Sequence, residues 1–283
     1  MYFTQPCSIK INLTLRVLGK RADGYHDLCS LFWRLRSPEV VEVSFGHFGD
    51  ELAVSGADIK GENIITRACR HIRSVSGDEL PGVRARLFKH LPAGSGVGAG
   101  SGNAAAFIRL CGAFAGHGNG PGAGVASLGA DVAFLASEHD LAIASGVGDE
   151  LEGIDGTLPM RAVIFFPEWS CCTKEAYGAL DEIRGRESGY MPESTARNEA
   201  LSVLDALRHG RRLGLLPNDF LDSAPHRGCY GELAGAASDS GAAAWGLCGS
   251  GSAFFALYGT SNECGKLLDK CRFDWLRQIL VLE

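Results

Sequence analysis

The sequence has no long apolar run, and this excludes a membrane-spanning helix. Nowhere along the 283 residues do about 18 to 20 apolar residues follow one another, which is the length that a helix needs to cross a bilayer. The first residues, MYFTQP, also lack the basic region and apolar stretch of a secretory signal. We therefore expect a cytoplasmic protein with no membrane partner.

A surplus of positive charge is missing as well. The chain carries 27 lysines and arginines against 33 aspartates and glutamates, a formal net charge of −6. Proteins that bind nucleic acid usually show a basic patch or stripe, so nucleic acid is not expected as a partner. An anionic metabolite is compatible with this balance, because a local site needs only a few donors.

The ten cysteines lack the spacing of a metal site or of a disulfide framework. There is no C-x-x-C pair, and Cys171 and Cys172 are adjacent, which suits neither zinc nor an ordinary disulfide. Others, such as Cys111 and Cys248, lie in apolar runs, where a thiol behaves as a small hydrophobic group. The sequence therefore predicts reduced cysteines and no metal held by dedicated protein ligands.

Hydrophobic periodicity predicts a mixture of strands and helices. Residues 7–17 alternate between apolar and polar, which predicts a half-buried strand with Lys10 and Asn12 on one face. Asn63 is expected to cap a helix that follows it. Further strands are predicted at 40–45, 83–89, 161–166 and 253–258, another helix at 198–209, and a surface loop at 116–124.

Glycine occupies every second position from Gly94 to Gly102, and a run of small and apolar residues follows. The pattern predicts a strand, a glycine loop and a buried helix in succession. A loop without side chains lets backbone N–H groups approach an anion, and a helix that begins next to it adds unpaired donors. The segment favours a nucleotide phosphate site, with a tightly packed glycine segment as the alternative.

Three common nucleotide signatures do not fit this segment. A Walker loop needs lysine and then serine or threonine after its last glycine, but no lysine lies between Lys89 and Lys174. Gly94-x-Gly96-x-x-Ala99 has the spacing of a dinucleotide fingerprint, yet the acidic residue about 20 positions further on is missing. The H-R-D and D-F-G motifs of protein kinases are absent too.

Three segments, in the right order, resemble the motifs of the galactokinase–homoserine kinase–mevalonate kinase–phosphomevalonate kinase (GHMP) superfamily. They are residues 10–13 (KINL), 92–105 (PAGSGVGAGSGNAA) and 247–253 (LCGSGSA). Within it, the chain is most similar to the 4-diphosphocytidyl-2-C-methyl-D-erythritol kinase family. The similarity lies in residues 19–26 (GKRADGYH), 129–132 (GADV), 146–150 (GVGDE) and 167–177.

The resemblance implies an α+β, two-lobed GHMP kinase fold. An N-terminal ATP-binding lobe, residues 1–155, would resemble domain 2 of ribosomal protein S5. A C-terminal lobe, residues 156–283, would be ferredoxin-like, with ATP and substrate meeting in the cleft between the lobes. The implied reaction is Mg²⁺-dependent transfer of a phosphoryl group from ATP to the 2-hydroxyl of the cytidyl substrate, a step of the non-mevalonate isoprenoid pathway.

The family's catalytic residues correspond to Asp131, as the base, and Lys10 beside it. A lysine there offsets charge that builds on the alkoxide or the γ-phosphate. Taken without the family, Asp131 reads as a helix cap and Lys10 as a solvated strand lysine. The resemblance assigns the ATP phosphates to Pro92, Ala93, Gly94, Ser95, Gly96, Val97, Gly98, Ala99, Gly100, Ser101, Gly102 and Asn103, with Ser101 near Mg²⁺.

Substrate recognition falls on residues outside the glycine segment. Tyr25 and His26 follow a turn signal and offer a stacking surface and directional hydrogen bonds for a cytosine base. Tyr177 would complete a sandwich around that base, Thr173 would bond the ligand near its phosphates or sugar chain, and Asn12 would position the hydroxyl or Asp131. The plain alternative for Tyr25, His26 and Tyr177 is that their rings only pack. Asn12 could instead be a surface residue, and His26 could instead act as a general base.

The chain departs from the family pattern at three positions. Gly102 and Cys248 replace hydroxyl residues and Ala133 replaces a proline. These changes leave open a nucleotide-binding sensor of the same fold that has lost catalysis. Another GHMP kinase acting on a different small alcohol is a second alternative, and a dinucleotide-dependent oxidoreductase a distant third. The expected partner is a small molecule with a cytidine diphosphate group, and the expected state is a monomer or weak homodimer.

Overall fold

The structure, a computed structural model, describes residues 1–57, 59, 61–76, 80–114, 124–184, 190–259 and 261–282. The chain forms two units. The first unit comprises residues 1–10, 34–93 and 98–139, and the second comprises 11–33, 94–97 and 140–283. The two consecutive lobes that the sequence predicts, 1–155 and 156–283, stay a prediction; in the structure, residues 11–33, 94–97 and 140–155 group with the later part of the chain.

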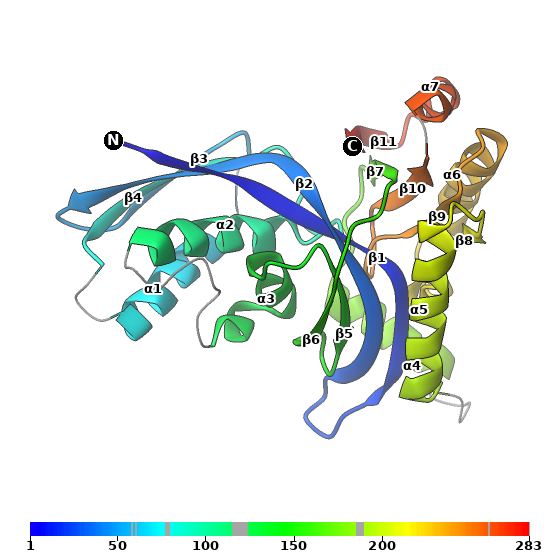
Figure 1. Cartoon of the computed structure of the whole chain (residues 1–283), viewed down its shortest axis with the longest axis horizontal. Coiled ribbons are helices and arrows are strands. Elements are labelled where there is room, and N and C mark those ends of the chain that lie inside the picture. Colours follow the sequence, from blue (N-terminus) through cyan, green and yellow to red (C-terminus); the bar gives the residue numbers. More distant parts are fainter. Residues whose placement is uncertain are drawn as a thin grey trace. The chain divides into compact units, whose positions relative to one another are not determined.

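In the first unit, helices cover one face of a small sheet (Figure 1). Strand β2 (His26–His47) runs antiparallel to β4 (Gly82–Phe88), and β3 (Glu51–Ser55) runs parallel to β4. The helical elements are α1 (Ile64–Ser76), α2 (Ala99–Phe114), η2 (Val125–Leu128) and α3 (Ala130–Ala136). The predicted strands at 40–45 and 83–89 are confirmed. So is the cap of α1, because Asn63 Oδ1 accepts the Ile65 N–H at 2.8 Å.

Helix α2 begins at Ala99, inside the glycine run and earlier than the sequence predicts. Its first turn is closed by a hydrogen bond from the Gly102 N–H to the Gly98 carbonyl oxygen at 2.9 Å. Glycine is tolerated in this turn because packing rather than propensity holds the helix: Phe107, Ile108 and Cys111 are all buried. Part of the predicted loop at 116–124 lies outside the described residues.

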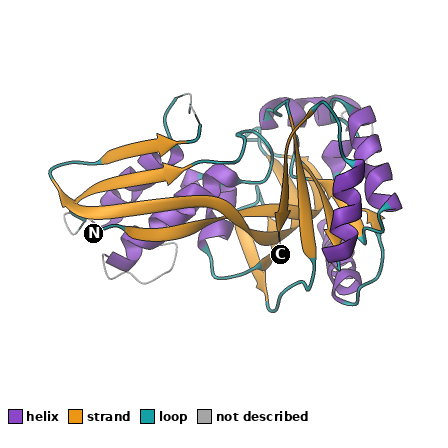
Figure 2. Cartoon of the chain, turned by 90° about the horizontal axis from the view of Figure 1, so that it is seen from above, coloured by secondary structure: helices purple, strands orange, loops and turns teal. Residues whose placement is uncertain are grey.

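The second unit contains two groups of strands, and helices pack around them (Figure 2). The first part of β2 pairs with β5 (Leu141–Ser145), which pairs with β6 (Glu150–Ile154). The other sheet has the order β11 (Leu276–Leu282), β7 (Arg161–Pro167), β10 (Phe254–Tyr258), β9 (Ala244–Leu247) and β8 (Gly214–Leu215). The remaining elements are α4 (Thr173–Arg184), α5 (Glu193–Arg208), η3 (Asp219–Leu221), α6 (Arg227–Asp239) and α7 (Ser261–Lys270).

An apolar core joins the helices of the second unit to its sheet. Phe165 and Phe254 from the strands pack with Leu180 of α4 and Leu233 of α6, and all four are buried. Short continuous apolar runs located the two strands, and the predicted strands at 161–166 and 253–258 are confirmed. The predicted helix at 198–209 is present as α5, and it begins five residues earlier, at Glu193.

Strand β1 (Phe3–Lys20) is longer than the predicted strand at 7–17, and it is not half-buried. Its polar residues Lys10, Asn12 and Thr14 are as buried as the apolar residues between them. The expectation was wrong because alternation only separates the two faces of a strand, whereas neighbouring elements cover both faces here. Each buried polar group therefore needs a partner, and the partners of Lys10 and Asn12 lead to the candidate site.

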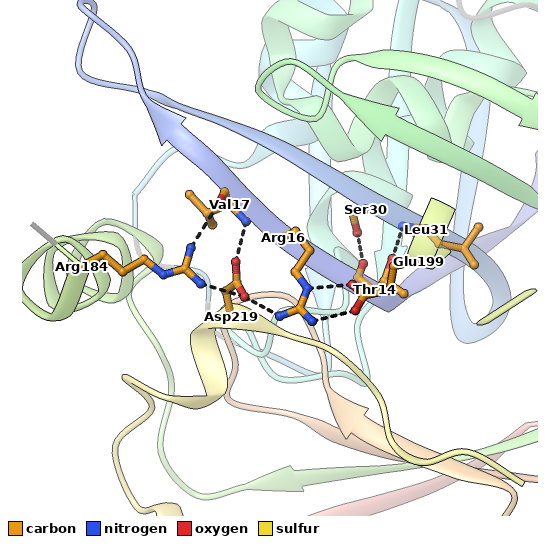
Figure 3. A network of polar contacts seen from close by, with 8 residues as sticks. All are labelled: Thr14, Arg16, Val17, Ser30, Leu31, Arg184, Glu199 and Asp219. Atoms are coloured by element: carbon orange, nitrogen blue, oxygen red, sulfur yellow. Dashed lines mark hydrogen bonds and ion pairs between the residues drawn. The ribbon is translucent and has the colours of Figure 1, made fainter. Parts of the chain in front are cut away.

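A network of charged groups ties β1 to the helices of the second unit (Figure 3). Asp219, 3% exposed, accepts bonds from Arg16 and Arg184 at 2.8 Å each and from the Val17 N–H at 2.8 Å. Arg16 also pairs with Glu199 of α5 through two hydrogen bonds, and Arg184 donates to the Val17 carbonyl oxygen. The last turn of α4 is thereby held against β1.

All ten cysteines are reduced thiols, as the sequence predicts. Burial raises the pKa of Cys69 to about 11 and that of Cys271 to about 11, so these thiols stay protonated at neutral pH. Within the described ranges, no helix has both the length and the apolar character that a membrane span requires.

Candidate active site

Lys10, Gly98 and Asp131 come together in the first unit. The Lys10 Nζ lies 3.5 Å from Asp131 Oδ1, in the first turn of α3. Gly98, directly before α2, lies against this pair: a Cβ atom there would be 3.2 Å from Asp131 Oδ2 and 3.5 Å from Lys10 Cγ. Lys10 is not the solvated lysine of the plain alternative, because its side chain is only 6% exposed, whereas that of Asp131 is 31% exposed.

Lys10, Gly98 and Asp131 lie where helix α2 begins. The first N–H groups of α2 have no partner within their own helix, and the helix dipole places partial positive charge at that end. A buried ammonium group and a helix N-terminus thus lie beside a carboxylate that is partly open to solvent. This combination can bind an anion and accept a proton in the same place.

The conformation of the glycine segment requires glycine. Gly94, Gly96 and Gly98 have φ values of 68°, 81° and 67°, in the left-handed region that side chains disfavour. In the second unit, a Cβ atom on Gly96 would lie 1.9 Å from the Cys248 carbonyl oxygen. The Ser95 carbonyl oxygen accepts the Ala253 N–H at 2.9 Å. The third motif of the superfamily, residues 247–253, therefore packs against residues 94–97; we call it the third glycine-rich motif.

These features fit a nucleotide phosphate group. In the first unit, the left-handed Gly98 leaves its backbone N–H group uncovered by a side chain, and α2, which begins at the next residue, adds the orphan donors of its first turn. Ser101 is the third residue of α2. The resemblance places its hydroxyl group near Mg²⁺, and this placement stays a prediction.

Asn103 supports the segment through its side chain. Its amide group donates to Glu39 Oε2 at 2.6 Å and lies 3.4 Å from the Cys7 sulfur. Glu39 Oε1 in turn accepts from Lys89 Nζ at 2.7 Å and from the Leu91 N–H at 2.8 Å. The Asn103 amide is therefore engaged inside the first unit, and it fixes α2 to the chain that leads into the glycine segment.

The departure at Gly102 has a structural reason. A Cβ atom at this position would lie 1.7 Å from the Ser8 carbonyl oxygen of β1. That contact is with backbone, so it could be relieved only by moving β1 away from α2. Glycine stands at this position because β1 and α2 approach each other closely there. The absence of the hydroxyl group is therefore not by itself a sign of lost catalysis.

Asn12 is buried rather than on the surface. Its Nδ2 donates to Ser30 Oγ at 2.8 Å, and Ser30 donates onward to the Thr14 carbonyl oxygen at 2.5 Å. A Cβ atom on Gly249 would lie 3.6 Å from Asn12 Oδ1. The Asn12 amide therefore has a fixed orientation in the second unit, beside the third glycine-rich motif.

His26 and Tyr177 stack on each other in the second unit. Their ring centroids are 4.5 Å apart with an interplanar angle of 18°. Tyr25, directly before His26, is 66% exposed, which leaves its ring open to a ligand. The predicted sandwich of a base with Tyr177 stays a prediction, since the described contact of Tyr177 is with the imidazole ring and, edge-on, with Phe220.

Thr173 is the first residue of α4. Its hydroxyl oxygen accepts from Ser250 Oγ at 3.3 Å, so the third glycine-rich motif also touches the start of this helix. Thr173 itself is exposed. A hydroxyl group at an exposed helix N-terminus is suited to a phosphate ligand.

Sequence reasoning missed Asp181, which lies next to His26. Asp181 Oδ1 is 2.7 Å from His26 Nε2, and Oδ2 is 2.6 Å from Lys20 Nζ. Burial alone would raise the pKa of Asp181, but the hydrogen bonds from Lys20 and His26 outweigh it and lower that pKa. The signal was available, because Tyr177 and Asp181 are four residues apart and hence share one face of a helix.

Comparison with known proteins agrees with this geometry. The model of the GHMP kinases N terminal domain matches residues 63–149. The chain is 30% identical over 281 residues to the 4-diphosphocytidyl-2-C-methyl-D-erythritol kinase of Chlorobium luteolum, covering 94% of this chain and 92% of that protein. The enzyme of the same name from Moorella thermoacetica is 32% identical, over 75% of this chain and 73% of its own length.

Solved structures give the same picture. A crystal structure of 4-(cytidine 5'-diphospho)-2C-methyl-D-erythritol kinase superposes with a TM-score of 0.75 at 27% identity, covering 99% of this chain and 98% of that one. The mevalonate kinase of Methanococcus jannaschii has a TM-score of 0.63 at 13% identity, over 99% and 97% of the two chains, and shows the fold alone. The predicted GHMP kinase fold is thereby confirmed; the detailed likeness of each lobe stays a prediction.

Proposed function

We propose that this chain, which belongs to the 4-diphosphocytidyl-2-C-methyl-D-erythritol kinase family, phosphorylates the 2-hydroxyl group of 4-diphosphocytidyl-2-C-methyl-D-erythritol with ATP. The observation that carries the proposal is the position of Gly98. It joins the start of α2 to the pair of Lys10 and Asp131, so a phosphate site and an acid–base pair lie side by side.

The phosphoryl donor would be held by backbone groups. Gly98 and the first turn of α2 would supply N–H donors to phosphate oxygens, and Lys10 would add a positive charge next to them. Little covalent chemistry is required of the protein in phosphoryl transfer, since positioning and charge stabilisation dominate. The residues of this segment need only keep their shape, which the left-handed glycines and Asn103 enforce.

Asp131 would act as the base. The substrate oxygen forms a bond to the γ-phosphorus of ATP while the bond from that phosphorus to the ADP oxygen breaks, and the hydroxyl proton passes to an Asp131 carboxylate oxygen. Asp131 is suited to this because it is partly exposed and its ion pair with Lys10 is a loose 3.5 Å. Lys10 offsets the negative charge on the reacting oxygen.

The substrate would be recognised by residues of the second unit. The exposed ring of Tyr25 offers a stacking surface for cytosine, and His26 offers a hydrogen bond to the edge of the base. Thr173 would bond the diphosphate or sugar chain, and the fixed amide of Asn12 would orient the reacting end. Mevalonate-like or sugar substrates have no base that could use Tyr25.

Three further features belong to the same proposal. Mg²⁺ would arrive with the nucleotide, with Ser101 near it. The protein would work in a reducing compartment such as the cytoplasm, which fits its ten reduced cysteines. It would act as a monomer or weak homodimer on a small molecule that carries a cytidine diphosphate group.

The test is ADP release by the purified protein with Mg²⁺-ATP. Four alcohols are compared: the cytidyl substrate, mevalonate, galactose and homoserine. We expect turnover with the cytidyl substrate alone. Selective turnover of one of the other three would contradict the proposed substrate, and ATP binding without turnover of any would favour the sensor of the same fold.

A further inference from the structure

His26 is held on two sides in the second unit. The residue is 7% exposed, and the Tyr177 ring stacks on one face of the imidazole. Its Nε2 atom faces Asp181 Oδ1 at 2.7 Å. The imidazole can therefore neither rotate freely nor exchange its two nitrogens without breaking these contacts.

Asp181 is held as firmly as His26. It projects from α4 one turn after Tyr177, and its second oxygen pairs with Lys20 Nζ of β1 at 2.6 Å. The end of the same helix is fixed by Arg184, whose guanidinium group pairs with the buried Asp219 (Figure 3). The carboxylate thus has one oxygen for Lys20 and one for His26.

This arrangement determines which histidine nitrogen carries the proton. An ionised carboxylate can only accept hydrogen bonds, so the nitrogen that faces Asp181 must be N–H. In a neutral imidazole the other nitrogen is then an acceptor, because the tautomer is set by the bond that one ring nitrogen makes. In its neutral form His26 therefore carries its proton on Nε2 and presents a lone pair at Nδ1.

A lone pair at Nδ1 distinguishes two pyrimidines. Cytosine has an amino group at position 4 of its ring and can donate to an acceptor, whereas uracil has a carbonyl oxygen there and would face Nδ1 with a second lone pair. A histidine with the opposite tautomer would reverse this preference. The identity of the base is thus read through the proton that Asp181 holds in place.

We propose that Asp181 is a specificity-determining positioning residue, which selects cytidine over uridine by fixing the Nε2–H tautomer of His26. The inference rests on the proposed function, in which His26 meets the base of the substrate. Asp181 itself does not touch the base. It acts through His26, and Lys20 acts through Asp181 by reserving one carboxylate oxygen.

The decisive variant is Asp181→Asn, which keeps the size of the side chain. Lys20 needs an acceptor, so the carboxamide oxygen turns toward Lys20 and the NH₂ group toward His26 Nε2. That nitrogen must then accept, and the proton moves to Nδ1. The double variant Asp181→Asn with Lys20→Met frees the carboxamide to turn its oxygen toward His26, so the original tautomer returns. Glu182→Gln is the matched control, because it removes one negative charge from the exposed neighbouring position of α4.

Two measurements test the proposal. Nitrogen-15 NMR of labelled histidine at about pH 8, with His26 assigned from the spectrum of His26→Gln, reports the tautomer. Titration calorimetry with cytidine diphosphate and uridine diphosphate reports the ratio of the two affinities. We expect Nε2–H in the wild type and in Glu182→Gln. Asp181→Asn should show Nδ1–H and a cytidine-to-uridine ratio lowered by about tenfold or more, with partial recovery in the double variant.

The two possible failures are distinguishable. Absence of turnover with the cytidyl substrate would overturn the proposed function, while the tautomer and the nucleotide ratio would still decide the role of Asp181. An Nδ1–H tautomer in the wild type would overturn that role. So would a cytidine-to-uridine ratio that stays within twofold of the wild type in Asp181→Asn, or a double variant that shows no recovery.

Discussion

Two aspartates, one in each unit, show how differently a carboxylate can be used. Asp219 of the second unit is buried, and its oxygens accept from two guanidinium groups and a backbone N–H, all at 2.8 Å. Asp131 of the first unit has a side chain 31% exposed, and its ion pair with Lys10 is 3.5 Å long. Glu199 and Asp219 also raise the pKa of Arg16, as expected of a tightly paired cation.

The difference separates a structural role from a chemical one. A buried carboxylate that is paired with two guanidinium groups and accepts at both oxygens cannot take up a proton without weakening the bonds that hold it, so its removal costs stability. A carboxylate with a single loose ion pair and access to solvent can accept a proton at little cost, so its removal costs activity. The following variants test this division.

The largest effect is expected for Asp131→Asn. The amide cannot take the hydroxyl proton, so turnover should fall by about a hundredfold to ten-thousandfold. The free energy of unfolding should change by less than about 1 kcal/mol, since the residue is not buried. Steady-state ADP release and urea unfolding, monitored by far-ultraviolet circular dichroism, measure the two quantities. An unfolded variant would make Asp131 structural instead.

Asp219→Asn should show the opposite pattern. Asp219→Asn removes the negative charge that Arg16 and Arg184 share in a buried network, and such losses cost about 3 to 5 kcal/mol. Urea unfolding gives the change in the free energy of unfolding. Turnover per folded molecule should stay within a few-fold of the wild type. A loss of turnover as large as that of Asp131→Asn, without loss of stability, would contradict the division.

Glu39→Gln tests whether a carboxylate is structural because of the unit it lies in or because of its burial and hydrogen bonds. Glu39 lies in the first unit, as Asp131 does, but it is fully buried. Its oxygens accept from Lys89, Asn103 and two backbone N–H groups. We expect a loss of about 2 to 4 kcal/mol. Thermal unfolding with and without ATP checks this. An unchanged stability would show that the hydrogen bonds accepted by a buried carboxylate do not predict how much stability its removal costs.

The smallest effect is expected at Asp50, whose side chain is 38% exposed. Hydrogen bonds from Arg73 lower the pKa of Asp50 from its usual 3.8. A lowered pKa in the folded state adds stability above the usual value, and that stability is lost as the pH falls through the lowered one. Asp50→Asn should therefore reduce the pH dependence of stability below about pH 4 by less than about 1 kcal/mol. Urea unfolding from pH 2 to pH 6 measures this. If Arg73 did not stabilise the ionised Asp50, the free energy of unfolding would depend on pH in the same way in the wild type and the variant.

The sequence predicts the elements of this fold better than it predicts their surroundings. Alternation located β1, and the glycine run located the start of α2 within a few residues, because both patterns are local. The burial of Lys10 and Asn12 was not predictable, since it depends on what covers the second face of the strand. The interleaved units have the same origin: β1 and β2 are long enough to contribute to both.

The candidate site shows the same limit. The family motifs pointed to Lys10, Asp131 and His26, and the structure supplies partners that no motif contains. Asp181, Glu39 and Asp219 are single acidic residues in ordinary helical or strand sequence, and only tertiary contacts give them their roles. Gly102 is the clearest case, because its departure from the family pattern is explained by the Ser8 carbonyl oxygen of a strand far away in the sequence.

The central claim is that Asp131 serves as the base in phosphorylation of the cytidyl substrate. Its most direct test is the rate of formation of the phosphorylated cytidyl product, at saturating Mg²⁺-ATP and substrate, for the wild type and for Asp131→Asn at equal folded concentration. The account predicts rapid product formation by the wild type and a rate lower by at least about a hundredfold for the variant. A variant that forms the product at nearly the wild-type rate would contradict it.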